Sequence, residues 1–291
     1  MANDFRIFVD AGCDIDSAYI KNGLVTMLTM SYSNGANMVE WTGLETDDDM
    51  HRFYDWQRNG GMTETTQLNK EDYEKAFWPL LRHGIGILYI SLSSALSPSY
   101  YQAVEFKKAI ERKYGRVPLY IVDSLSATGG IGIFAENAVM CKQMGYGLEQ
   151  TAKVIATLSG KVHSWFYVND LDYLRRNGKT SATKSMIGTL LGVKPILEIS
   201  SDGKLRQIDK KFGSKKACEV LKDLYVSNRN TESNSTVYIT HADSLETATR
   251  LRTMVHHESG NIEIKVRYLS PIIGAHTGPG IIALHHVGFY S

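Results

Sequence analysis

The chain has few cysteines, and their positions argue against one class of protein. Its 291 residues include three cysteines, Cys13, Cys141 and Cys218, which are odd in number, widely spaced and without a Cys-x-x-Cys pair. This set argues against both a disulfide framework and a zinc site. We expect a protein of a reducing compartment.

An excess of charge and long apolar runs are also absent. With 32 basic and 31 acidic residues the formal charge is +1, so no global field attracts nucleic acid or an anionic membrane. No apolar run approaches the roughly 18 residues that cross a bilayer, and the N-terminus lacks the basic and apolar parts of a signal sequence. We therefore expect a cytoplasmic protein that has no nucleic-acid partner and no stable membrane insertion, and that binds any anionic ligand locally.

The signatures of nucleotide and metal sites are missing as well. The chain has no Gly-x-x-x-x-Gly-Lys loop, and no Gly-x-Gly-x-x-Gly turn follows its first predicted strand. The acidic run Asp47-Asp48-Asp49 is better explained as a helix N-terminus, where the helix dipole favours negative charge. The sequence predicts neither a cofactor nor a metal.

Short apolar runs alternate with amphipathic stretches over residues 1–160. The apolar runs predict strands at residues 5–9, 24–30, 86–92 and 119–122. The amphipathic stretches predict helices at residues 47–58, 69–84, 97–114, 130–144 and 148–158, with Asn69 as a cap, Gly84 as a stop and Ser97-Pro98 as a helix start. Strands connected by helices are typical of a parallel sheet. We predict an N-terminal α/β/α domain with a mostly parallel sheet.

The pattern changes near residue 160. Strands are predicted at residues 161–168, 195–199, 205–208, 237–240, 262–269 and 281–287, helices at 170–176, 215–225 and 245–255, and an exposed loop at 227–235. The turn Ser201-Asp202-Gly203 is typical of a hairpin. Residues 161–291 therefore predict a second α/β domain with a mixed or antiparallel sheet.

Three turns far apart in sequence share small and hydroxyl-bearing residues. They are Thr65-Thr66-Gln67, Ser91-Leu92-Ser93-Ser94-Ala95-Leu96-Ser97 and His276-Thr277-Gly278-Pro279-Gly280. The first two precede predicted helices, where free backbone N–H groups favour a carboxylate or phosphate. The second also follows the carboxyl end of a strand, where ligands of open α/β sheets gather. Together the turns predict one anion-binding site, although Ser93, Ser94, Thr65 and Thr66 could equally serve as caps and turn residues.

The histidines need separate interpretations. A single histidine near a strand is more often structural, but the glycines after His276 allow a close backbone approach, so we favour a ligand contact there. His285 and His286 are adjacent on a predicted strand and should face opposite ways. We expect both to be structural.

A serine hydrolase is the catalytic alternative, with Ser93, His276 and Asp123 as a triad. The chain has no Gly-x-Ser-x-Gly elbow, and Asp123 is expected to cap the helix that follows its strand. We therefore do not expect hydrolase activity.

Five segments resemble the motifs of one known family, in the same order and over nearly the whole chain. They are Asp10-Ala11-Gly12-Cys13-Asp14-Ile15, Thr65-Thr66-Gln67, Ser93-Ser94-Ala95-Leu96-Ser97-Pro98-Ser99-Tyr100, Val122-Asp123-Ser124 and His276-Thr277-Gly278-Pro279-Gly280. The family is the DegV family of bacterial fatty-acid-binding proteins. The resemblance implies a two-domain DegV-like fold in which residues 1–160 bind lipid and residues 161–291 close over the ligand.

The resemblance also implies a function. The protein would be a carrier without catalytic machinery that buries a long-chain fatty acid in an apolar tunnel through the first domain. The carboxylate would be held by Thr65, Ser93 and Ser94, with Thr66 and His276 close by. A separate kinase resembling dihydroxyacetone kinases would then convert the carboxylate to an acyl phosphate.

Three positions depart from the family pattern. A serine is replaced by Ala11, a Gly-Arg pair by Gly178-Lys179, and a Gly-Thr pair by Pro98-Ser99. These changes concern head-group contact and partner docking more than the fold. A basic stretch, Lys210, Lys211, Lys215 and Lys216, is either a solvated face or a docking surface for the kinase.

Two other functions remain open at this point. One is an enzyme acting on a small anionic metabolite, phosphorylated or carboxylated, and the other is a lipid sensor that uses the same pocket without a kinase. An enzyme predicts a wet cleft, whereas a carrier or a sensor predicts a dry tunnel.

Overall fold

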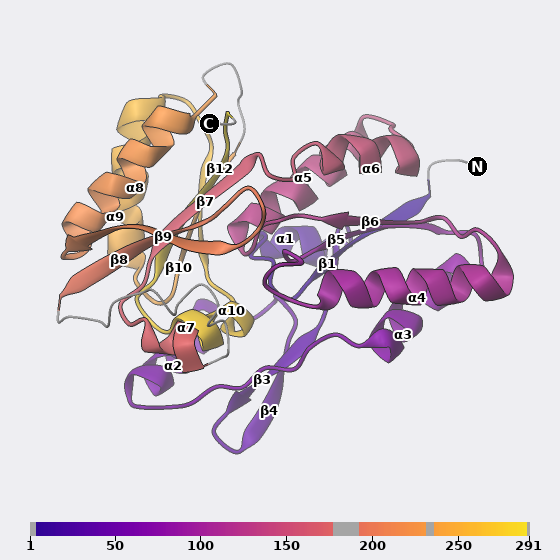
Figure 1. Ribbon diagram of the computed structural model, residues 1–291, viewed down its shortest axis with the longest axis horizontal. Helices are drawn as coiled ribbons and strands as arrows, with labels where there is room; N and C mark the ends of the chain where they lie inside the picture. The colour runs from indigo at the N-terminus through magenta and orange to yellow at the C-terminus, as the bar shows by residue number, and fades with distance from the viewer. Residues whose placement is uncertain (1–3, 177–191, 231–235, 290–291) are drawn as a thin grey trace.

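The computed structural model describes residues 4–176, 192–230 and 236–289, which form two large β-sheets, a two-stranded sheet and flanking helices (Figure 1). The first sheet is parallel and has the strand order β2-β1-β5-β6. Its strands are β1 (Phe5–Asp10), β2 (Thr26–Leu28), β5 (Gly86–Ser91) and β6 (Leu119–Asp123). The predicted parallel sheet is confirmed.

Helices cover both faces of this sheet, as Figure 1 shows. One layer holds α3 (Lys70–Leu81) and α4 (Ser99–Tyr114), and the other holds α5 (Gly129–Gln143) and α6 (Leu148–Ala156). The short α1 (Ser17–Lys21) and the longer α2 (Asp47–Arg58) precede these layers in sequence. The predicted α/β/α arrangement is therefore present.

Side-chain caps explain where two helices begin. Thr46 and Asp49 form a reciprocal capping box at the start of α2, and Asn69 and Asp72 form another at the start of α3. Each box satisfies backbone N–H groups that a helix N-terminus leaves without a partner. The acidic run at residues 47–49 is thus the first turn of a helix, as predicted.

The second sheet is mixed, with the strand order β11-β10-β12-β7-β8-β9. Only β10 and β11 pair in parallel among its described strands. The strands are β7 (Val162–Tyr167), β8 (Val193–Ile199), β9 (Leu205–Phe212), β10 (Val237–His241), β11 (Ile264–Tyr268) and β12 (Ile282–Val287). The predicted mixed sheet of the C-terminal part is confirmed.

The second sheet separates two hydrophobic cores. On one face, side chains such as Phe166, Leu197 and Ala283 join the large core that continues into the first sheet. On the other face, side chains such as Trp165 and Leu284 pack against α8 (Ser214–Asn228) and α9 (Leu245–Ser259). Because strand side chains alternate between faces, neighbouring residues of one strand belong to different cores.

A shared hydrophobic core connects the first sheet, in the N-terminal half of the chain, with the second sheet in the C-terminal half. Helix α5 packs against β1 and β5 of the first sheet and against β7, β10 and β12 of the second. The last strand of the first sheet ends at Asp123 and the first strand of the second begins at Val162. A domain boundary at residue 160 stays a prediction.

Several elements differ from the sequence prediction. A hairpin of β3 (Met30–Asn34) and β4 (Asn37–Trp41) was not expected, nor was α10 (Pro271–Thr277). Helix α8 continues to Asn228, which shortens the expected loop at 227–235, and residues 231–235 lie outside the described residues, as do Gly178-Lys179.

The start of α4 also differs from the prediction. The helix begins at Ser99 with Pro98 as its N-cap residue, and the Ser97 hydroxyl accepts a hydrogen bond from the Ser99 backbone N–H at 3.3 Å. Ser97 therefore supports the helix start from just outside it.

Throughout the described part of the chain, no helix is both long and apolar enough to cross a membrane.

Candidate functional site

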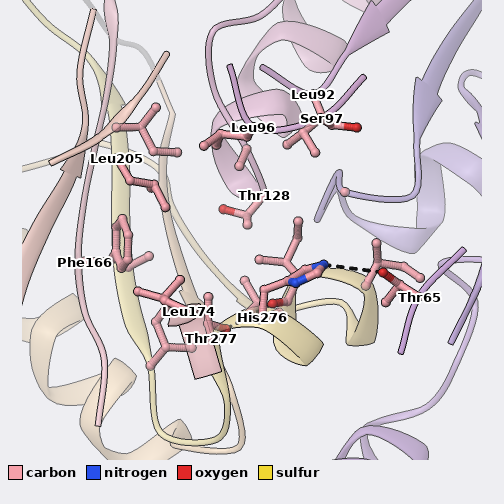
Figure 2. Close-up of a pocket in the computed structure, with 18 of the residues that line it drawn as sticks. Thr65, Leu92, Leu96, Ser97, Thr128, Phe166, Leu174, Leu205, His276 and Thr277 are labelled. Atoms are coloured by element: carbon pink, nitrogen blue, oxygen red, sulfur yellow. Dashed lines mark hydrogen bonds between the residues drawn. The ribbon is translucent and has the colours of Figure 1, made fainter. Parts of the chain in front are cut away.

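A cavity of about 150 Å³ lies where the two sheets share their core. Figure 2 shows Thr65 and His276 on one side of it and Phe166 and Leu205 on the other. The described residues that line it include no Asp, Glu, Lys or Arg. Its apolar walls are formed by Met30, Leu92, Leu96, Ala127, Phe166, Leu174, Ile199, Leu205, Leu269, Ile272, Ile273, Ile281 and Ala283. The walls thus come from both halves of the chain, whereas the sequence analysis placed the tunnel through the first domain alone.

The buried carboxylate of Asp10 stabilises the part of the cavity wall that belongs to the first sheet. The two carboxylate oxygens of Asp10 accept hydrogen bonds from the backbone N–H of Gly12 at 3.0 Å and of Leu92 at 2.8 Å. Burial raises the pKa of Asp10 to about 6, although these hydrogen bonds oppose the shift. The carboxyl ends of β1 and β5 are therefore tied together where Gly12 and Leu92 reach the cavity wall.

A polar pair lies at one end of the cavity. The Thr65 hydroxyl oxygen is 3.4 Å from Nε2 of His276, and the dashed line in Figure 2 marks this contact. Thr65 is held by a bridge to Tyr32 in β3, and His276 belongs to α10. Packing has therefore joined two of the predicted anion-binding turns, which are 211 residues apart in sequence.

Thr66 lines the cavity beside this pair, but its hydroxyl already has partners. It accepts a hydrogen bond from the Ser31 backbone N–H at 2.8 Å and donates to the Ser31 carbonyl at 3.4 Å. The hydroxyl of Thr66 thus fastens its own segment to β3.

The turn after His276 requires glycine because residues of the C-terminal half pack closely against it. Gly278 and Gly280 have φ of 72° and 84°, which favour glycine. A Cβ on Gly278 would lie 2.5 Å from the Tyr173 ring, and one on Gly280 would lie 1.7 Å from the Asn169 side chain. The close approach that the sequence analysis read as a ligand contact is made by Tyr173 and Asn169.

Ser93 and Ser94, which were predicted to contact an anion, do not line the cavity. The fully buried Ser93 donates its hydroxyl hydrogen to the Gly203 carbonyl at 2.9 Å and accepts from the Ala95 backbone N–H at 3.2 Å. The Ser94 backbone N–H donates to the Asp123 carboxylate at 3.1 Å. Their turn reaches the cavity through Leu92, Leu96 and Ser97. Direct ligand contact by Ser93 or Ser94 stays a prediction.

The three residues of the hydrolase alternative have separate partners. Ser93 bonds to Gly203, and His276 contacts Thr65. Asp123 accepts from the backbone N–H groups of Ser94 and Leu125, each at 3.1 Å. Asp123 therefore ties the turn after β5 to the turn after β6, and the expectation that it caps a following helix is wrong because α5 begins only at Gly129.

Sequence reasoning missed two polar residues of the cavity wall, Thr128 and His285. The Thr128 hydroxyl oxygen lies 2.9 Å from Nε2 of His285. His286 packs instead against Trp165 and Tyr225 on the opposite face of the sheet, as the alternation predicted. Because strand side chains alternate, Ala283 and His285 share the cavity face, and this pattern could have identified His285.

The arrangement suits an amphipathic ligand. Hydroxyl and imidazole groups at one end can donate hydrogen bonds to an anionic head group without a buried fixed charge. The remaining wall is mostly aliphatic and excludes water from a bound chain.

This chain is similar to known proteins over almost its whole length. A DegV domain-containing protein of Clostridium perfringens is 29% identical over 284 residues, which cover 98% of this chain and 97% of that protein. A DegV family protein of Ruminococcus gnavus, solved with vaccenic acid, has a TM-score of 0.84 at 20% identity, covering 97% of this chain and 99% of that one. The Streptococcus pneumoniae fatty acid kinase B3 protein, solved with linoleic acid, has a TM-score of 0.82 at 17% identity, covering 98% and 100%.

The two solved structures establish that the fold is the one found in DegV proteins. The model of the DegV family, described as a family of uncharacterised proteins, matches residues 4–287. The chain therefore belongs to the DegV family.

Proposed function

We propose that this protein is a cytoplasmic carrier that binds a long-chain fatty acid in the cavity between its sheets. The observation behind the proposal is a mostly aliphatic wall from both halves of the chain with the Thr65–His276 pair at one end. Solved members of the same family hold vaccenic acid and linoleic acid, which supports this ligand class.

The acyl tail supplies most of the affinity in this proposal. Each buried methylene contributes about 0.8 kcal/mol, so fifteen would offer roughly 12 kcal/mol before the costs of association. The head group then mainly fixes the orientation of the chain.

The cavity must enlarge to hold such a tail. Its volume of about 150 Å³ is similar to that of an engineered cavity that holds one benzene molecule. Parts of the wall come from loops and short helices, including Leu96 and Leu174. We infer that these segments move away from the second sheet as the chain enters.

We assign the carboxylate to the end formed by Thr65 and His276, with Thr66 and Ser97 beside them. The Thr65 hydroxyl and the His276 imidazole can each donate a hydrogen bond to a carboxylate oxygen. Ser93 and Ser94 belong to the same turn as Ser97. Ser93 would donate to the carboxylate only if its hydrogen bond to the Gly203 carbonyl were broken.

The chain would act without catalysing the next step. A separate kinase, resembling dihydroxyacetone kinases, would supply ATP, and a carboxylate oxygen would attack its γ-phosphorus. This step forms the acyl phosphate and releases ADP. Weak neutralisation of the carboxylate by hydroxyls and imidazole keeps it nucleophilic.

Native mass spectrometry of the purified protein, followed by solvent extraction, tests the proposal. We expect stoichiometric fatty acid, or a mass shift of one ligand when stearate is added to delipidated protein. A mass that never changes with added fatty acids would refute the carrier. The alternative, an enzyme acting on a small anionic metabolite, would then be tested by measuring turnover of phosphorylated and carboxylated compounds.

The kinase step is tested separately. Stearate-loaded protein is mixed with a dihydroxyacetone-kinase-like protein and ATP, and acyl phosphate is trapped with hydroxylamine. Hydroxamate should form only with both proteins present. Binding without hydroxamate formation would support the lipid sensor instead of the carrier.

A further inference from the structure

The cavity wall contains a second polar position besides Thr65 and His276. It consists of Thr128, the residue before α5, and His285 on β12, which are 5% and 2% exposed. Figure 2 places Thr128 between the Thr65–His276 side and the Phe166–Leu205 side. A polar side chain is thus set into a wall that is otherwise apolar around it.

The hydrogen bonds of His285 leave one hydroxyl hydrogen unused. Its Nδ1 lies 2.8 Å from the Ser164 hydroxyl, whereas its Nε2 is shared by the hydroxyls of Thr128 at 2.9 Å and Thr240 at 3.2 Å. Burial lowers the pKa of His285 to about 3, so the ring is neutral and carries one N–H.

The tautomer of His285 decides which hydroxyl hydrogen is unused. If Nε2 carries the proton, it donates, Nδ1 accepts from Ser164, and the Thr128 and Thr240 hydroxyl hydrogens both remain available. If Nε2 is the acceptor, its one lone pair takes one hydroxyl hydrogen, and the Thr128 hydrogen remains available only when Thr240 is that donor. Thr128 lines the cavity and Thr240 does not, so the inference takes the tautomer with the proton on Nε2.

The backbone of Thr128 is strained. Its φ of 55° and ψ of −129° are rare and unfavourable for a β-branched residue. Backbone hydrogen bonds tie it to the segment after β1, from the Thr128 N–H to the Gly12 carbonyl at 2.8 Å and from the Asp14 N–H to the Thr128 carbonyl at 3.3 Å. A glycine would relieve the strain but would lack the hydroxyl that contacts His285.

We propose that Thr128 donates a hydrogen bond to an oxygen atom carried along the acyl chain, so that the pocket prefers hydroxy or keto fatty acids. The inference rests on the proposed function. An unsubstituted chain would expel water and leave the Thr128 hydroxyl hydrogen without an acceptor, which is costly in an apolar site. An oxygen at the matching position removes that cost.

The test compares stearate with a set of hydroxystearates that carry the hydroxyl at different positions. In the wild-type protein, at least one positional isomer should bind about tenfold more tightly than stearate. Thr128→Val keeps the side-chain shape and should abolish this preference, so that the hydroxystearates bind no more tightly than stearate. The control is Thr277→Val, which also lines the cavity but whose hydroxyl donates to the Ile273 carbonyl at 3.2 Å; it should keep the preference.

The possible results separate this inference from the proposed function. If stearate binds and no hydroxystearate binds better, the fatty-acid site stands and the role of Thr128 is refuted, even if Thr128→Val fails to fold. If Thr128→Val weakens all ligands equally, its role is structural and the inference also fails. If neither stearate nor any hydroxystearate binds, the fatty-acid function fails.

Discussion

The Ser93 hydroxyl donates a hydrogen bond to the Gly203 carbonyl, and this contact joins the turn after β5 to the turn between β8 and β9. The two turns belong to different sheets and meet beside the cavity wall that Leu92 and Leu205 form. Ser93 thus ties the N-terminal and C-terminal halves of the chain together beside the cavity wall.

Replacing Ser93 by Ala should lower the free energy of unfolding by about 1–2 kcal/mol, because the buried Gly203 carbonyl loses its donor. It should also weaken stearate binding, because the turn that carries Leu96 and Ser97 loses an anchor. Ser94→Ala is the control, since Ser94 contributes a backbone N–H to Asp123. Urea unfolding and calorimetric titration measure both effects, and equal behaviour of the two variants would contradict the prediction.

The head-group assignment predicts effects on charge recognition. Thr65→Val and His276→Ala should each weaken stearate binding about tenfold, since each removes a donor to a carboxylate. Methyl stearate, which lacks the charge, should lose much less affinity. His257→Ala, whose side chain is 87% exposed, is the control. Equal losses for the acid and the ester would place the carboxylate elsewhere.

The position of the tail is tested by filling the cavity. Ala283 lines it and pairs with Phe166 in the sheet register, so Ala283→Leu should lower stearate affinity at least tenfold. A short acid that does not reach this wall should be affected less. Leu284→Met, on the same strand but facing the other core, changes side-chain volume little and should leave the dependence on chain length unchanged. Identical losses for all chain lengths would argue against a tail at Ala283.

Asp10 and Asp14 are both buried carboxyls, but the amide substitution should affect them differently. Both carboxylate oxygens of Asp10 accept hydrogen bonds from backbone N–H groups. In Asp10→Asn the side-chain NH₂ must therefore face one of these N–H donors, which should lower the free energy of unfolding by about 1–3 kcal/mol. Asp14 accepts a backbone hydrogen bond from Ser270 at 2.9 Å, and Asn can accept it as well. Denaturant unfolding near neutral pH compares the two, and an equal loss in both would contradict this account.

Asp14 should also make stability depend on pH. Burial raises the pKa of Asp14 from 3.8 to about 8, so between about pH 4 and 8 the unfolded chain releases a proton that the folded state keeps. Stability should therefore fall as pH rises through this window. Asp14→Asn should remove this part of the slope and gain stability relative to wild type at about pH 8.5. Unfolding measured at about pH 5 and 8.5 checks the sign, and parallel slopes would contradict it.

Local sequence signals identified most of the fold. The apolar run of β5 is fully buried, and the cap Asn69 acts within one helical turn, so both can be identified without tertiary information. The β3–β4 hairpin was missed because its two short strands mix a few buried apolar residues with polar and exposed ones. One of its edges is completed by residues 64–66, which are distant in sequence.

The site was predictable only in part. Composition singled out the turns at residues 65–67 and 276–280, and tertiary packing brings Thr65 to His276. The partner of Ser93 is a carbonyl in the other sheet, and nothing near Ser93 in sequence indicates it. The glycines after His276 suggested a ligand, whereas Tyr173 and Asn169 explain them.

The two-core arrangement constrains how β12 can change during evolution. Ala283 and His285 face the cavity, whereas Leu284 and His286 face the layer of α8 and α9. Substitutions that respect this alternation can alter ligand preference and leave the outer helices intact. Insertion or deletion of one residue within β12 would exchange the two faces at once, so diversification of ligand choice in this strand should proceed by substitution, with its length kept fixed.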